Sequence, residues 1–180
     1  MFTWKIINEK YTDYLREKFD SRIPQTNYGS DKLKPFFGAL FTLDDLVYVT
    51  QVTSPKPRHN NLKQSLDFYK IYDGSKLVSC INLNYMFPVP KDELSDLEYR
   101  NIDEYVSFPN EVTKSKYIQL LRFELAEINK LSLDKKAVML YNHKYDKPND
   151  FLSQRCFDFK KLEQGAYQWI KSKDDSLILT

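Results

Sequence analysis

The dipeptide Asp73-Gly74, between the strand-like runs 66–72 and 76–83, is the feature that most constrains the fold of this chain. Asp-Gly is a strong signal for a tight turn between antiparallel strands, because its residues tolerate the positive φ angles that such turns require. The sequence therefore predicts a β-hairpin here. An antiparallel meander of this kind can close into a small barrel.

A second hairpin is predicted upstream. Residues 36–41 and 46–52 are rich in aromatic and β-branched side chains, and they flank the turn signal Asp44-Asp45. Residues 84–90 suit a short strand that stops at its prolines, because proline cannot donate to a central ladder. The N-terminal half is therefore expected to be mainly antiparallel sheet.

The start of the chain predicts one more strand and a long connection. Residues 2–7 suit an opening strand, and Asn8 or Thr12 can cap the short helix that follows. Residues 22–35 contain two prolines, one glycine and no apolar period, which indicates an exposed loop. Long loops inside compact domains are often functional.

Helical spacing dominates the C-terminal half. One apolar face recurs at intervals of three, four and seven residues, with Thr113 as a candidate cap. Residues 133–145 and 157–169 predict two further helices, and 91–111, with seven acidic against two basic residues, indicates a surface connection. The repeated face comprises Tyr117, Leu120, Leu121, Glu124, Leu125, Ile128 and Leu131.

These patterns predict a single α+β domain over residues 1–180. Residues 1–90 are expected to form mainly a compact, twisted antiparallel β-barrel, 91–111 an acidic connection, and 112–180 mainly helices. No apolar run approaches the roughly 20 residues of a membrane span, and the first residues lack an apolar signal core. Cys80 and Cys156 are far apart and indicate neither a disulfide framework nor a zinc site, so a reducing cytoplasm is expected.

The charge is unevenly distributed, although the net value is only +2. Residues 32–70 hold six Lys/Arg against three Asp/Glu, and residues 112–173 hold thirteen against seven. Thirteen Tyr and twelve Phe accompany these cations, and aromatic faces beside lysines are typical of single-stranded nucleic-acid binding. Ordinary solvated faces and a large aromatic core account for the same composition.

The loop 53–61, TSPKPRHNN, follows a hydrophobic strand and is dense in hydroxyls and cations. Thr53 and Ser54 can donate hydrogen bonds to a phosphate oxygen, and Lys56 can hold a positive charge against developing negative charge. The prolines beside Lys56 limit the freedom of the backbone. Composition alone describes equally well a rigid turn with a surface lysine.

This loop resembles the TSPK loop of the ToxN/AbiQ family of type III toxin–antitoxin endoribonucleases. The resemblance extends to 34–38 (KPFFG), 66–71 (LDFYKI) and 81–89 (INLNYMFPV), and so to most of residues 1–130. Within the family, the abortive-infection member AbiQ is the one that the sequence resembles most.

The resemblance implies a barrel like that of the MazF/Kid toxins, with added helices. It also implies RNA cleavage without metal or cofactor, in which the ribose 2′-hydroxyl attacks the adjacent phosphate and leaves a 2′,3′-cyclic phosphate and a 5′-hydroxyl. The implied partners are target RNA of phage or host, and a small repeated antitoxin RNA that the toxin processes and that inhibits it. RNA-bridged oligomers and a role in phage defence belong to the same expectation.

The family's functional lysine can be placed at two positions here. Its distance to the strand glycine Gly38 selects Lys34, whereas its distance to the upstream tyrosine selects Lys32. The glycine is the better anchor, which favours Lys34. With that choice, the resemblance places the catalytic residues at Tyr28, Lys34, Thr53, Ser54, Lys56 and Tyr117.

The remaining cations are candidates for RNA contact. They are Lys32, Arg58, His59, Lys63, Lys114 and Lys116. His59 is also a candidate general base, because the unperturbed pKa of histidine lies near neutrality. Lys56 is expected to act as a charge, with Lys34 or Tyr28 assisting proton transfer.

Two other functions fit the same sequence. A non-catalytic RNA-binding or translational-control module would bind RNA without cutting it. A MazF-type toxin with a protein partner fits the motifs less well than the RNA-antitoxin family does.

Overall fold

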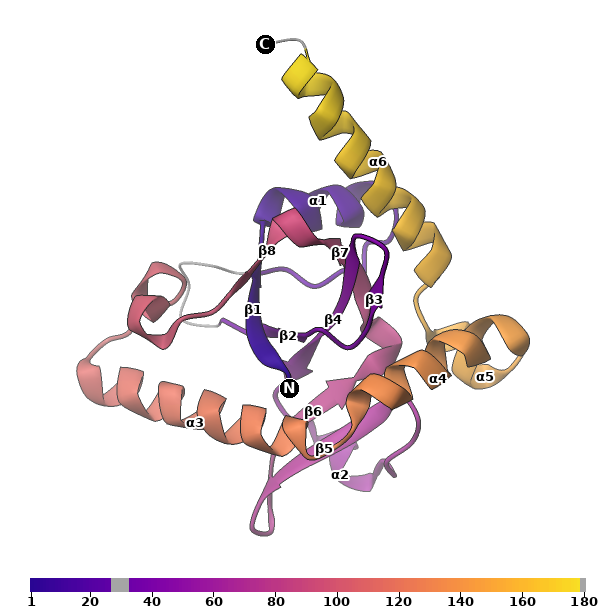
Figure 1. The fold of residues 1–180 in the computed structure, drawn as a ribbon. Helices are drawn as coiled ribbons and strands as arrows, with labels where there is room; N and C mark the ends of the chain where they lie inside the picture. The colour runs from indigo at the N-terminus through magenta and orange to yellow at the C-terminus, as the bar shows by residue number, and fades with distance from the viewer. Residues whose placement is uncertain (27–32, 179–180) are drawn as a thin grey trace.

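The computed structural model describes residues 1–26 and 33–178, which form an antiparallel sheet of eight strands with helices around it (Figure 1). None of the helices in these ranges is long and apolar enough to cross a membrane. The strands are β1 (Thr3–Ile7), β2 (Phe36–Gly38), β3 (Thr42–Leu43), β4 (Leu46–Thr53), β5 (Phe68–Asp73), β6 (Lys76–Asn82), β7 (Phe87–Pro90) and β8 (Leu94–Asp96).

The strand order is β5-β6-β4-β2-β1-β8, with β3 and β7 also paired to β4. β4 is the longest strand and is largely buried. It pairs with β3 and β7 near its start, and with β2 and β6 toward its end. β4 therefore organises the sheet. Its last residue, Thr53, is the first residue of the loop 53–61, which the sequence predicts to bind phosphate.

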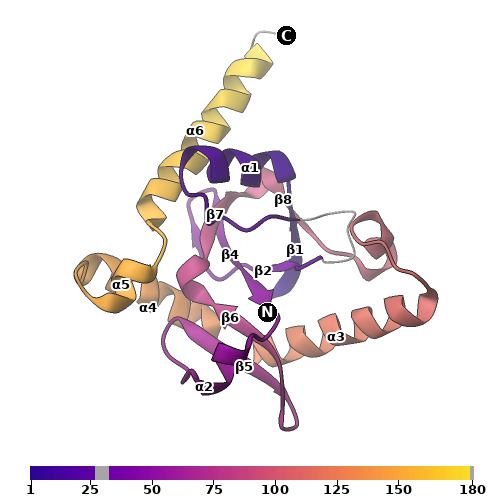
Figure 2. The same ribbon diagram turned by 180° about the vertical axis from the view of Figure 1, so that it is seen from behind.

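The sheet is open, so the closed MazF-like barrel expected from the sequence is not found. The ends of the order are β5 and β8, and no pairing joins them among the described residues. β6 meets β4 only at Val52 and Thr53, so the β5–β6 hairpin projects from the end of β4 (Figures 1 and 2). A closed barrel requires a consistent stagger of the hydrogen-bond register between all neighbouring strands. The short pairing between β4 and β6 does not continue such a stagger. The α+β class and the C-terminal helices are confirmed.

The helices cover two ends of the sheet. α6 packs against α1 and β7, while α3 contacts β5 and α4 contacts the 3-10 helix η1 (Leu83–Tyr85). The C-terminal part of α6 extends beyond the sheet (Figure 1). The α-helices are α1 (Glu9–Lys18), α2 (Pro57–Asn61), α3 (Glu111–Asn129), α4 (Leu133–Asp146), α5 (Phe151–Arg155) and α6 (Phe159–Ile178).

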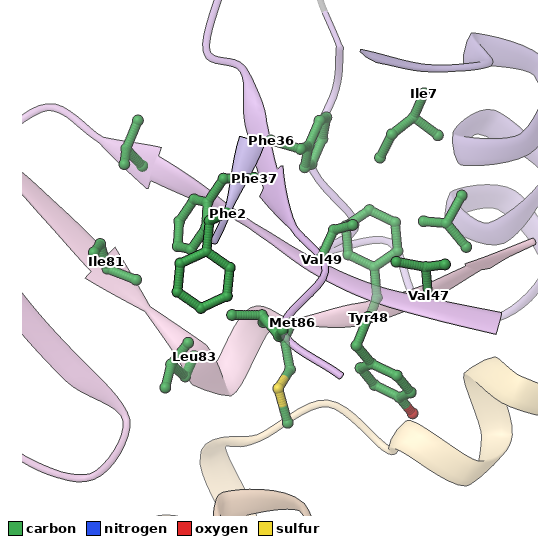
Figure 3. Packing of buried hydrophobic residues seen from close by; sticks show 14 of the residues in the cluster. Phe2, Ile7, Phe36, Phe37, Val47, Tyr48, Val49, Ile81, Leu83 and Met86 are labelled. Carbon is green, nitrogen blue, oxygen red and sulfur yellow. The ribbon is translucent and has the colours of Figure 1, made fainter. Parts of the chain in front are cut away.

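Aromatic and aliphatic side chains pack together in the core between the strands (Figure 3). The Phe37 ring is fully buried and lies edge-on to Phe2 and Trp4, with ring centroids 5.7 and 6.1 Å apart. Phe36 and Phe87 meet edge to face at 5.6 Å. Edge-to-face pairs of this kind add to the stabilisation that burial provides. Most of the Phe and Tyr rings that suggested base stacking from composition are therefore structural.

The predicted hairpin at Asp73-Gly74 is confirmed as β5–β6, with Gly74 at φ 57°. The hairpin around Asp44-Asp45 is confirmed in part. Its first strand is divided into β2 and β3, of which β3 forms the direct hairpin with β4. The spacing of side chains gave no sign of this division.

The predicted acidic connection, 91–111, contains structure that the sequence did not indicate. β8 lies within it and pairs with β1 from Lys5↔Asp96 to Ile7↔Leu94. Lys5 also forms an ion pair with Asp96 at 2.7 Å. This edge strand is mostly exposed, so it lacks the apolar run by which a strand is recognised.

The helix predicted over 113–131 is confirmed as α3, but its cap is Asn110 rather than Thr113. The Asn110 side chain accepts hydrogen bonds from the backbone N–H and hydroxyl of Thr113, at 2.9 and 3.0 Å. The helix is fixed to the sheet because Trp4 Nε1 donates to the carbonyl of Leu121 at 3.0 Å. This contact lies one helical turn from Tyr117 on α3.

Candidate functional site

The hydroxyl- and cation-rich loop begins where β4 ends at Thr53, and it leads into the short helix α2. Two hydrogen bonds close the loop. Lys56 N–H donates to Nδ1 of His59 at 3.1 Å, and the His59 N–H donates to the Lys56 carbonyl at 2.8 Å. Pro57 occupies the first helical position, where its fixed φ angle is compatible with the helix. The backbone at Lys56 is therefore held from both sides.

His59 supports this loop from inside the protein. Its residue is only 3% exposed, and its ring lies 5.6 Å from that of Phe68. Burial lowers the pKa of His59, and the cations Arg58, Lys56 and Lys70 lower it further. The imidazole is therefore held neutral, with Nδ1 as the acceptor from Lys56.

We expect His59 to make the stability of the protein pH-dependent. Because its pKa is depressed in the folded state, its contribution is complete above the unfolded value of about 6.5 and is lost as the pH falls through the lower folded value. The free energy of unfolding should therefore decrease from pH 7.5 to 5.5, and less so in His59→Asn. Urea unfolding at both pH values measures this difference.

The other histidine provides the control. His143 lies on the surface of α4, with its Nε2 atom 2.7 Å from Oδ2 of Asp150. In the His143→Asn variant, the free energy of unfolding should still decrease from pH 7.5 to 5.5 by the amount that His59 contributes. Equal pH dependence in His59→Asn and wild type would contradict the assignment.

A cavity of 320 Å³ opens beside the loop. It is lined by four of the predicted residues: Thr53, Lys56, Arg58 and His59. Lys56 and Arg58 are exposed, so their positive charges are available to a ligand. The same wall contains side chains that the sequence did not single out as functional, among them Arg22, Asn82 and Tyr85. Asn82 and Tyr85 lie in the segment 81–89 that resembles the family, but that resemblance gave them no role, and Arg22 comes from a separate segment.

A second, smaller cavity of 90 Å³ contains the other described catalytic candidates. It is lined by Lys34, Thr53, Ser54 and Tyr117. The Tyr117 hydroxyl donates to the Leu33 carbonyl at 2.8 Å, which ties α3 to the segment before β2. Burial, with a further contribution from Glu124, raises the pKa of Tyr117 well above its usual value. The phenol is therefore a neutral hydrogen-bonding group at physiological pH.

Glu124 is a site residue that sequence reasoning missed. Its place on the apolar face of α3 indicated only packing, but it lines the smaller cavity and is 5% exposed. Burial raises the pKa of this carboxyl, against a smaller opposing effect of the nearby Ser79 hydroxyl. The sequence contained one indication of this role, because Glu124 is a charged residue on an otherwise apolar helical face.

Among the described residues, the three remaining predicted lysines, Lys63, Lys114 and Lys116, line neither cavity. Tyr28 and Lys32 lie outside the described residues. Lys114 is paired with Asp103, which offsets its charge. Lys63 and Lys116 are exposed.

Thr53 lines both cavities, so they adjoin at the end of β4. A phosphate placed there would meet the hydroxyls of Thr53 and Ser54 and the charge of Lys56. Such fixed donors and charges stabilise negative charge that develops in a transition state. Across residues 1–26 and 33–174, no group of three His, Cys, Asp or Glu side chains is arranged to hold a metal ion.

Comparisons with known proteins identify relatives of this chain. A family model described as "Toxin ToxN, type III toxin-antitoxin system" matches residues 4–167. Endoribonuclease ToxN of Pectobacterium atrosepticum is 30% identical over 131 residues, which cover 70% of this chain and 72% of that protein.

Solved structures have the same fold. One, from work on a processed non-coding RNA that regulates a bacterial antiviral system, is 28% identical with a TM-score of 0.67, and the match covers 90% of this chain and 95% of that one. AbiQ, a lactococcal anti-phage endoribonuclease of a type III toxin–antitoxin system, is 18% identical with a TM-score of 0.72, covering 95% and 99%. A third, from work on selective toxin inhibition by a non-coding RNA pseudoknot, is 22% identical with a TM-score of 0.67, covering 93% and 97%.

Proposed function

This chain belongs to the ToxN toxin family of type III toxin–antitoxin systems, and we propose from this premise that it is an endoribonuclease that cuts RNA at the end of β4. The observation that carries the proposal is the placement of Thr53, Ser54 and Lys56 around the junction of the two cavities. These residues belong to the segment TSPK, which resembles the loop motif of the family.

The proposed reaction uses the RNA itself as the nucleophile. The ribose 2′-oxygen forms a bond to phosphorus, the bond from phosphorus to the 5′-oxygen breaks, and the products carry a 2′,3′-cyclic phosphate and a 5′-hydroxyl. DNA lacks the 2′-hydroxyl and is not a substrate. Thr53 and Ser54 orient the phosphate, and Lys56 stabilises the charge that builds on its oxygens.

Two protons must move in this reaction. One leaves the 2′-hydroxyl and one reaches the departing 5′-oxygen. Lys34, on the wall of the smaller cavity, and Tyr28 are the proposed groups for these transfers. Tyr117, which lines the same cavity as Lys34, acts as a neutral hydrogen-bonding group. The scheme needs charge and proton transfer alone, so we propose that it runs without a metal ion.

The proposed partner is an RNA that both inhibits the toxin and is processed by it. Two of the solved relatives come from work on a non-coding RNA that regulates an antiviral system and on inhibition by an RNA pseudoknot. A small repeated RNA would occupy the cation-lined cavity and exclude other substrates. When its supply fails during phage infection, the freed toxin would cut cellular or phage RNA.

We expect purified protein to cut a random-sequence single-stranded RNA pool in the presence of EDTA. The products should carry cyclic phosphate and 5′-hydroxyl ends. Such products resist ligation as formed and become ligatable once polynucleotide kinase has removed the cyclic phosphate and phosphorylated the 5′-hydroxyl. The matched control is a pool of the same sequence design made entirely of 2′-deoxynucleotides, which should remain intact.

Three outcomes would overturn parts of this proposal. Products with 5′-phosphate ends, or cleavage that stops in EDTA, would exclude the metal-independent 2′-hydroxyl mechanism. Tight binding of the whole RNA pool without any cleavage would instead favour a non-catalytic RNA-binding module.

A further inference from the structure

The larger cavity extends beyond the residues that the proposed cleavage uses. Its remaining wall contains Arg22, Asn82 and Tyr85, which lie before β2, at the end of β6 and in η1. We propose that this wall is a nucleotide subsite: the base next to the cut stacks on Tyr85, Asn82 contacts its edge, and Arg22 binds a neighbouring phosphate. This inference rests on the proposed endoribonuclease function and adds a source of sequence preference to it.

Tyr85 offers a fixed aromatic surface. The residue is 38% exposed, and its ring meets Phe157 edge to face at 5.2 Å. The segment around it is held in place because Phe157 N–H donates to the Asn84 carbonyl at 3.0 Å, and Met86 N–H donates to the Leu83 carbonyl at 3.0 Å. An exposed ring on a rigid support is a stacking platform for an unpaired base.

Arg22 is oriented by its neighbours. Its Nε and Nη2 donate to the two carboxylate oxygens of Asp20, at 3.0 and 2.6 Å, and its Cζ lies 4.9 Å from the centre of the Phe157 ring. Within the described residues Nη1 has no hydrogen-bond partner. The contact with Asp20 offsets the charge of Arg22, so Lys56 and Arg58 supply the net positive charge of the cavity wall, and Arg22 contributes its Nη1 donor to a phosphate oxygen.

Asn82 supplies the group that can distinguish bases. Its backbone is fixed by the β6 ladder, and its carbonyl accepts from the Thr50 hydroxyl at 3.0 Å. In the described part of the chain, its side-chain amide makes no hydrogen bond. An amide presents one acceptor and two donors, which can pair with the edge of a single base.

The dimensions fit one nucleotide. The cavity has a volume of 320 Å³, at the lower end of the roughly 300–1,000 Å³ of small-molecule sites. Thr53 is part of its wall, so a nucleotide bound there would be the neighbour of the phosphate that is cut. The smaller cavity, at 90 Å³, leaves less space for a second base.

The test sequences the cleavage products of a random RNA pool for wild type, Asn82→Ala, Tyr85→Leu and Tyr72→Ala. In wild type, one position beside the cut should show a base preference, and Asn82→Ala should lose it at that position only. Tyr85→Leu, which keeps apolar volume but removes the ring, should lower kcat/KM by about 5- to 150-fold, the range expected for one lost stacking contact. Tyr72, which is 43% exposed near the turn of the β5–β6 hairpin and does not line the cavity, is the matched aromatic control and should change neither quantity.

The cleavage experiments distinguish failure of the proposed subsite from failure of the proposed nuclease function. Wild-type cleavage with an unchanged preference in Asn82→Ala and unchanged kcat/KM in Tyr85→Leu would overturn the subsite but leave the nuclease intact. An absence of cleavage by wild type across the whole pool would instead overturn the proposed function. Circular dichroism melting of each variant separates loss of the subsite from loss of the fold, and Asn82→Ala keeps the test decisive if Tyr85→Leu does not fold.

Discussion

Replacing Lys56 by alanine is expected to lower the rate of RNA cleavage by about 10²–10³-fold. Lys56 is exposed on the wall of the larger cavity, and the loop that carries it is held by its own backbone and by His59 rather than by the lysine side chain. The substitution should therefore leave the melting temperature unchanged while it removes the charge that opposes negative charge on the phosphate. Single-turnover cleavage of a defined RNA measures the loss.

A matched lysine separates this local effect from a general loss of attraction to RNA. Lys171 is exposed on α6, so Lys171→Ala removes the same charge away from the cavities. Its cleavage rate should remain within about twofold of wild type at moderate salt, where distant charges are screened. A folded Lys56→Ala variant with wild-type activity would exclude Lys56 from catalysis.

Replacing Trp4 by alanine is expected to reduce the free energy of unfolding by about 3–5 kcal/mol, a large share of the roughly 5–15 kcal/mol typical of a domain. Trp4 is 2% exposed, and its ring lies edge-on to Phe37. The change creates a cavity and also leaves the Leu121 carbonyl without the donor that fixes α3 to β1. Chemical denaturation, with the slope checked for constancy, measures the effect.

Tyr72→Ala is the control for this prediction as well. Tyr72 is an exposed aromatic residue of β5, and its loss should change stability by no more than about 0.5 kcal/mol. A decrease of less than 1 kcal/mol in Trp4→Ala would show that the sheet and α3 are not coupled through this side chain.

The elements that the sequence predicted well are those whose signal is local. The Asp73-Gly74 turn, the apolar period of α3 and the first strand each depend on neighbouring residues alone, and each is confirmed. β8 and the division between β2 and β3 were missed, because an exposed edge strand of three residues and an interrupted strand are stabilised by their partners rather than by their own composition. The closed barrel was not confirmed for the same reason, since closure depends on the stagger between distant strands.

The candidate site likewise has one part that the sequence identified and another part that only the tertiary structure assembled. By itself the sequence identified the family and the TSPK loop, because a contiguous motif needs no tertiary structure to be recognised. Only the tertiary structure placed Glu124 beside Ser54, buried the His59 ring beneath Lys56, and brought Arg22 and Tyr85 to the same cavity wall. These side chains come from segments far apart in the chain, and it is the packing of α3, η1 and the end of β4 that brings them together. Burial and proximity, which set the pKa values and the shape of the cavity, arise only when that packing forms.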